Sequence, residues 1–156
     1  MRDMGSLYPS GVDLVWLGID QSGTVAAFIT AGDGPVPLSV LQDIIADDVD
    51  VEDEIYHLPE SSEAILTVSV PRPDSFTSIS RKGIFVYDWG EFLHNPIGIK
   101  QSYRLVAKPD TPLLFSALPS KFRDTVPYVK FMNVSFGNSD TISPDDAMKW
   151  ISESDE

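Results

Sequence analysis

The chain has 156 residues, of which 42% are hydrophobic and 22% charged, a composition typical of one globular domain. Its formal net charge is −13, and residues 3–71 contain thirteen acidic residues but no lysine or arginine. Nucleic acids and anionic membranes require clustered Lys and Arg, so neither is an expected partner, and the lack of cysteine excludes disulfides and thiolate metal sites.

The N-terminus shows no apolar segment typical of a secretory signal, and no apolar stretch approaches the ~20 residues that span a bilayer. We therefore expect a cytoplasmic protein that is not embedded in a membrane. Residues 1–156 are interpreted as a single domain, with residues 1–10 and 152–156 frayed.

The first predicted elements are two strands and a helix. Residues 12–19 and 24–30 are apolar and rich in β-branched and aromatic side chains, and the Asp20–Gly23 turn between them predicts a hairpin. Apolar residues at helical spacing from Leu38 to Ile45 then predict a helix, with Pro37 in its first turn.

The remaining predicted elements complete an α+β domain. Strands are expected at 63–70, 83–89, 103–108 and 128–136, a short helix at 74–81 followed by Gly83, and a last helix from Ser143. The expected architecture is a mostly antiparallel sheet of five to six strands with two to three helices packed on one face.

The segment Gly32-Asp33-Gly34 lies between a strand and a helix, which is where a phosphate-binding loop would occur. A dinucleotide fingerprint would need glycine where Pro37 stands, and no lysine precedes Lys82. We therefore interpret the segment as a structural turn, in which the glycines supply positive φ and the prolines direct the chain.

The segment 47–54 is acidic at six of its eight positions, and no cation nearby in the sequence neutralises it. An EF-hand beginning at Asp48 would need glycine and glutamate where Asp53 and Pro59 stand, so that pattern fails. A solvated loop, an irregular calcium site and a protein-docking surface remain open. We expect no metal or cofactor, and the candidate partner-binding residues are Asp47, Asp48, Asp50, Glu52, Asp53 and Glu54.

No catalytic residue is assigned. Glu91 and His94 form an E-x-x-H pair without the second histidine of a zinc protease, and no G-x-S-x-G marks a nucleophile. An alternative hypothesis is a small enzyme or ligand-binding protein with a pocket near the end of the strand at 83–89. Its candidate residues are Tyr87, Asp88, Trp89, Glu91 and His94.

The chain resembles a family of small, uncharacterised bacterial proteins over about residues 12–119. The stretches DLVWLGIDQSGTVAAFITAGDGPVP, GIFVYDW and YRLVAKPDTPLLFSALP carry the resemblance. The matching positions are Trp16, Gly18, Asp20, Gly23, Ala26, Phe28, Thr30, Ala31, Gly32, Gly34, Pro35, Pro37, Gly83, Phe85, Tyr87, Asp88 and Trp89.

By size and charge the chain is similar to immunity proteins of bacterial polymorphic toxin systems, which bind a cognate toxin. The resemblance implies a non-enzymatic module that masks a basic protein surface, and it carries over no catalytic residue. A self-associating structural protein is the third hypothesis.

Overall fold

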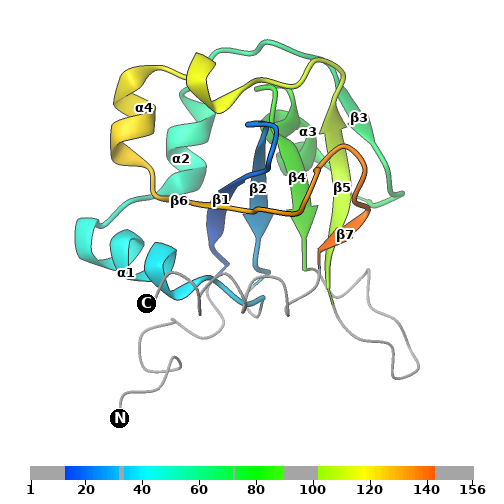
Figure 1. Cartoon of the computed structure of the whole chain (residues 1–156). Helices are drawn as coiled ribbons and strands as arrows, with labels where there is room; N and C mark the ends of the chain where they lie inside the picture. The colour runs from blue at the N-terminus through cyan, green and yellow to red at the C-terminus, as the bar shows by residue number, and fades with distance from the viewer. Residues whose placement is uncertain (1–12, 32–33, 72, 90–101, 143–156) are drawn as a thin grey trace.

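The computed structural model describes residues 13–31, 34–71, 73–89 and 102–142, which form an α+β fold (Figure 1). The strands are β1 (Val15–Ile19), β2 (Val25–Ile29), β3 (Ala64–Leu66), β4 (Phe85–Asp88), β5 (Tyr103–Pro109), β6 (Tyr128–Lys130) and β7 (Thr141–Ile142). The helices are α1 (Leu38–Asp47), α2 (Val51–Tyr56), α3 (Asp74–Ser80) and α4 (Ser120–Thr125), with the 3₁₀ helix η3 (Phe115–Ala117).

The strands form one mixed sheet in the order β3-β5-β4-β2-β1-β6, and β7 pairs with β5. Strands β1 and β2 make the predicted antiparallel hairpin, with Trp16 opposite Phe28. The β3–β5, β4–β5 and β5–β7 pairs are also antiparallel, whereas β2–β4 and β1–β6 are parallel. The predicted α+β class with a mostly antiparallel sheet is confirmed.

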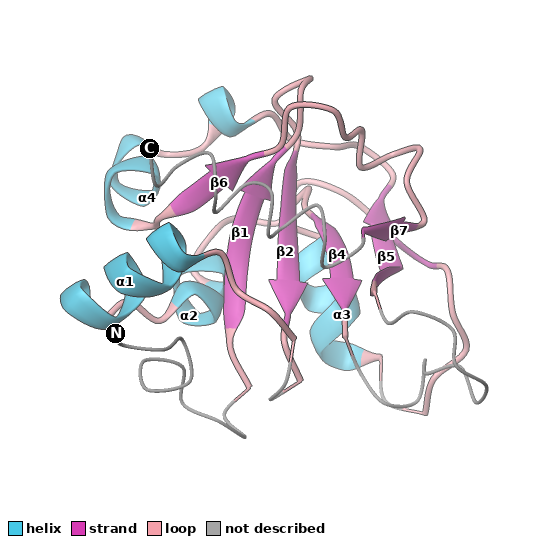
Figure 2. Cartoon of the chain, turned by 60° about the horizontal axis from the view of Figure 1, so that its bottom comes forward, coloured by secondary structure: helices cyan, strands magenta, loops and turns pink. Residues whose placement is uncertain are grey.

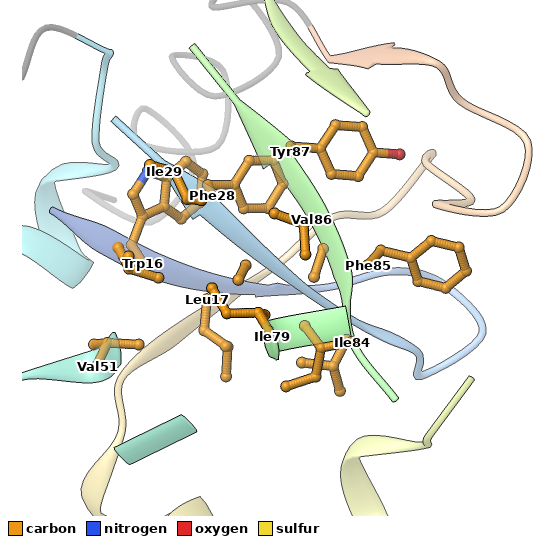
Figure 3. Packing of buried hydrophobic residues seen from close by; sticks show 14 of the residues in the cluster. Trp16, Leu17, Phe28, Ile29, Val51, Ile79, Ile84, Phe85, Val86 and Tyr87 are labelled. Atoms are coloured by element: carbon orange, nitrogen blue, oxygen red, sulfur yellow. The ribbon is translucent and has the colours of Figure 1, made fainter. Parts of the chain in front are cut away.

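The centre of the sheet is buried on both faces, since every residue of β1, β2 and β4 is buried. On one face Trp16 stacks on Phe28 with ring centroids 4.2 Å apart, and Phe28 stacks on Tyr87 at 5.2 Å. Side chains alternate between the two faces along each strand. Leu17 and Val86, which lie opposite the same residue of β2, therefore belong to the other face. Figure 3 shows the aromatic side chains on one side of the strands and Leu17 on the opposite side.

The chain after β6 covers the aromatic face. The pattern of residues 128–136 predicts a single strand, but β6 ends at Lys130, and Phe131 and Phe136 then pack on the sheet, each with its ring centroid within 6.0 Å of that of Phe28. Gly18 makes this approach possible, because a Cβ there would lie 2.7 Å from the Phe131 ring. The segment runs across the strands in Figure 1.

Helices α2 and α3 cover the opposite face, where Val51 and Ile79 approach Leu17 (Figure 3). Helices α1 and α4 lie at the β1–β6 side of the sheet (Figure 2). The acidic segment therefore does not form a continuous loop, because Val51 and Ile55 are buried and hold its second half as a helix.

Several other boundaries differ from the sequence pattern. The strand predicted at 63–70 is reduced to β3, and α4 and β7 were not predicted. Gly83 follows α3 with φ of +89°, as expected for a helix end. The helix predicted from Ser143, residues 1–10 and residues 152–156 lie outside the described residues. Among the described helices, none has the length and apolar character to cross a bilayer.

Gly34 is required for space and not for its φ, which corrects the expectation that it supplies a positive φ. A Cβ on Gly34 would lie 2.5 Å from the Tyr103 hydroxyl and 3.0 Å from Cβ of Trp89. Among the described residues of this turn, Ala31 is left-handed, with φ of 53°. Tyr103 also donates a hydrogen bond to the Pro35 carbonyl at 2.8 Å, which ties the turn to β5.

Asp20 is a buried carboxylate whose hydrogen bonds explain its place after β1. It accepts from the backbone N–H of Ser22 at 2.9 Å and of Thr24 at 3.0 Å, and from the Thr24 hydroxyl at 2.7 Å. It also accepts from the N–H of Phe136 at 2.9 Å, across 116 positions of sequence. Asp20 therefore closes the hairpin turn and fastens the chain after β6 to it.

Candidate partner-binding surface

The acidic surface, defined as Asp47, Asp48, Asp50, Glu52, Asp53 and Glu54, lies at the junction of α1 and α2. Asp47 is the last residue of α1, and Asp48 follows in the left-handed conformation with φ of 53°. Asp50 caps α2, because its side chain accepts a hydrogen bond from the Asp53 N–H at 3.1 Å.

Four of the six acids contribute to the stability of α2. Asp50 satisfies an N–H that the helix leaves unpaired, and Glu52, Asp53 and Glu54 lie in the first turn, where the helix dipole favours negative charge. The sequence pattern did not separate these local roles from partner binding, because it did not predict α2.

Asp47 and Asp48 have no such local role. Both side chains are exposed, and both stand at the C-terminal end of α1, where the helix dipole disfavours negative charge. Asp48 also carries the cost of a left-handed backbone, for which glycine is the better residue. These two carboxylates therefore lower the stability of α1 in the isolated protein.

Few cations approach the acidic surface. Among the described residues, the one contact within 4.0 Å between an acidic and a basic side chain joins Asp53 to His57, with Oδ2 and Nδ1 3.7 Å apart and both side chains more than half exposed. The Tyr56 hydroxyl donates to Glu52 at 2.8 Å, and partial burial together with this bond raises the pKa of Tyr56. The surface therefore keeps a strong negative potential.

Lys82 contributes to this region from below the surface. The residue is 9% exposed, and its ammonium group donates to the Leu58 carbonyl at 2.6 Å and the Tyr56 carbonyl at 3.3 Å. It thus caps the C-terminal end of α2, where a positive charge is favourable. The sequence alone did not identify Lys82, because it lies 26 positions after Tyr56.

A groove of about 300 Å³ adjoins the acidic surface between α2 and α4. Its apolar part comes from the buried side chains Leu58 and Phe122, and its rim carries two carboxylates and two basic groups. The lining residues are Asp53, Glu54, His57, Leu58, Pro119, Lys121 and Phe122. We call this the α2–α4 groove.

The described residues of the alternative pocket are buried in the core or pack against it. Tyr87 is fully buried, and its hydroxyl donates to the carbonyls of Phe136, at 3.0 Å, and of Ser139. Asp88 is 3% exposed, and Trp89 is half-buried against the Tyr103 ring. Glu91 and His94 lie outside the described residues, so the pocket stays a prediction.

The acidic surface shows no metal-binding arrangement: among the described residues, no group of three or more His, Asp or Glu side chains is placed to hold an ion. Comparison with protein-family models, with curated proteins and with solved structures gives no match.

Proposed function

We propose that the chain is a non-enzymatic protein-binding module whose acidic surface docks on a basic partner, as an immunity-type protein docks on a toxin. The observation that carries the proposal is the position of Asp47 and Asp48. They are exposed, lie at the unfavourable end of α1, and have no Lys or Arg within 4.0 Å among the described residues. A basic partner would compensate charges that the isolated fold disfavours.

The proposed mechanism has an electrostatic and a short-range part. The acidic surface attracts a cationic partner over about 10 Å at moderate ionic strength and raises the association rate. The α2–α4 groove then receives a Lys or Arg side chain, whose aliphatic stem packs on Leu58 and Phe122 while its charged end reaches Asp53 or Glu54. Such a contact masks the partner's basic group.

The immunity assignment rests on the resemblance in size and charge to immunity proteins. Under this assignment, the partner is the toxin encoded beside this gene. A basic enzyme that acts on nucleic acid or anionic lipid would lose its substrate-binding surface when the acidic protein covers it.

The test is co-purification of the chain with the product of the adjacent gene, followed by affinity measurement at low and high salt. We expect a complex that weakens as salt rises. In Asp47→Asn/Asp48→Asn we expect the affinity to fall about tenfold, because each exposed ion pair contributes up to ~1 kcal/mol.

The matched control is Asp110→Asn/Asp140→Asn, which changes the net charge equally at two exposed acids outside the acidic surface and the α2–α4 groove. We expect this control to bind like the parent chain. Absence of a complex at low salt, or equal affinity for both double variants, contradicts the proposed function.

A further inference from the structure

A second groove lies on another part of the surface, between the β1–β2 turn, η3 and β6. Its volume is about 350 Å³. Buried Ile19 and half-buried Phe115 supply apolar lining, and the Phe115 and Tyr128 ring centroids are 4.6 Å apart. The lining residues are Ile19, Gln21, Ser22, Gly23, Leu114, Phe115, Ser116, Tyr128 and Lys130. We call this the β6 groove.

Large apolar side chains are exposed in the β6 groove and on the chain that follows β6. Leu114 is 47% exposed and Tyr128 43%, and both line the groove. Met132, two positions after Lys130, is 61% exposed. Clustered exposed apolar side chains are typical of a surface that contacts another protein, whereas small-molecule sites bury most of the ligand.

The charge of the β6 groove is opposite to that of the chain. Lys130 is the one charged side chain among the nine lining residues, in a chain of net charge −13. The other polar lining side chains, Gln21, Ser22 and Ser116, are neutral. The groove therefore favours a ligand with an apolar group beside a carboxylate, and disfavours the basic ligand expected at the acidic surface.

Strand β6 is the last strand on its side of the described sheet. It pairs in parallel with β1, and the Phe131 N–H donates to the Ile19 carbonyl at 2.8 Å. Because backbone groups alternate along a strand, the N–H and C=O of Tyr128 and Lys130 point away from β1. In the pairing with β1, Lys130 lies opposite Ile19, so the side chains of Tyr128 and Lys130 share the face of Ile19 and are two positions apart, the spacing of alternate side chains in an extended segment.

We propose that the β6 groove binds an extended segment of a partner protein in which a large apolar residue is followed by an acidic residue. The apolar side chain packs between Leu114 and Tyr128, and the carboxylate pairs with the Lys130 ammonium. This site does not depend on the acidic surface, so either can fail without the other.

The experiment uses a labelled heptapeptide that contains one phenylalanine followed by aspartate. Its other five residues are valine and threonine in alternation. We expect saturable binding to the full chain, with amide shifts in the NMR spectrum concentrated at Ser22, Ser116 and Lys130. The same peptide with lysine in place of aspartate should bind about tenfold more weakly, because an attractive rim charge becomes repulsive.

Two variants test the residues. Lys130→Glu should weaken binding of the aspartate peptide about tenfold and strengthen that of the lysine peptide. Arg81→Glu, with the same charge change at the C-terminal end of α3 and outside both grooves, should alter neither. Leu114→Ser should weaken both peptides. Each substituted side chain is exposed, so the unfolding curves of all variants should match that of the parent chain.

Three results overturn the proposal: equal affinity for the two peptides, shifts that avoid the groove, or Lys130→Glu binding like the parent chain. Equally tight binding of phenylpropionate at the same amides would make the groove a small-molecule site and contradict a protein occupant. A dimer that Leu114→Ser dissociates would name a second copy of the chain instead.

Discussion

The indole N–H of Trp16 donates a hydrogen bond to the Tyr103 hydroxyl at 3.1 Å, joining residues 87 positions apart inside the aromatic face. The same hydroxyl donates to the Pro35 carbonyl at 2.8 Å. A single oxygen thus links β1, β5 and the turn that leads into α1.

Replacing Tyr103 with phenylalanine should therefore destabilise the protein. The variant leaves the Trp16 N–H and the Pro35 carbonyl without this partner, and each such buried polar group costs about 1–3 kcal/mol. Urea unfolding followed by tryptophan fluorescence measures the loss. Tyr128→Phe, at an exposed position, should leave the midpoint unchanged; equal effects of the two variants would contradict the assigned role of the Tyr103 hydroxyl.

Gly34→Ala tests whether this turn is limited by space. The added methyl group would lie 2.5 Å from the Tyr103 hydroxyl, so we expect a loss of about 1–3 kcal/mol from overpacking. Gly137→Ala is the control, because its methyl group would find its nearest atom at 3.8 Å, an ordinary contact. Thermal unfolding compares the two, and a stable Gly34→Ala variant would exclude the close approach.

Asp48→Gly should raise the stability of the protein while it weakens partner binding. Glycine relieves the left-handed backbone at φ of 53° and removes a charge from the unfavourable end of α1, together about 1 kcal/mol. Asp50→Ala changes the net charge equally but removes the cap of α2, so it should cost about 1 kcal/mol. Two variants with the same sign of effect in urea unfolding would contradict this division of the acidic surface.

Tyr87 should make the fold sensitive to alkaline pH. Burial, with smaller effects of the Asp140 and Asp20 charges, raises the pKa of Tyr87 above its ordinary value of 10.0. The unfolded chain loses this proton near pH 10 while the folded chain keeps it, so the free energy of unfolding should fall as pH rises above about 10.

The measurement is the urea midpoint at pH 8 and at pH 11 for the parent chain and Tyr87→Phe. The variant should start lower, because the bond to the Phe136 carbonyl is lost, but should decline less with pH. An equal fall of the urea midpoint in both proteins would show that other groups cause the loss of stability at alkaline pH. Tyr56, whose pKa is also raised, would then be the next residue to replace.

Asp20→Ala should detach the chain after β6 from the hairpin turn. The carboxylate accepts four hydrogen bonds, and bonds to a charged acceptor contribute about 1.5–3 kcal/mol each before relaxation, so a loss of at least about 3 kcal/mol is expected. Amide exchange should accelerate at Phe136. If the amide of Phe136 exchanges as slowly in the variant as in the parent chain, the bond from Phe136 to Asp20 does not anchor the chain after β6.

The sequence predicted the central strands and failed at the margins. Residues of β1, β2 and β4 form short apolar runs bounded by turn residues, a pattern with few alternative structures. The run 128–136 alternates like a strand, yet Phe131 and Phe136 turn back because the aromatic face has to be covered. That requirement arises only from tertiary packing.

The run of acidic residues in the sequence predicted the acidic surface. It did not predict which of these acids stabilise α2 and which do not. The different positions of Asp47 and Asp48, at the end of α1, and of Asp50, at the start of α2, become visible only once α2 is known. The sequence did not reveal α2, because its two buried residues, Val51 and Ile55, are surrounded by charged residues. The β6 groove had no local signal, since Gln21, Leu114 and Tyr128 meet only in the folded chain.

The bond between Asp20 and the Phe136 N–H also has a consequence for synthesis. When the ribosome has released β1 through β5, the rings of Trp16, Phe28 and Tyr87 still lack the residues that cover them. The nascent chain then exposes an aromatic sheet face until Phe136 emerges. The face is thus covered only after Phe136 has emerged, and a chaperone that binds aromatic segments would hold the chain during that interval.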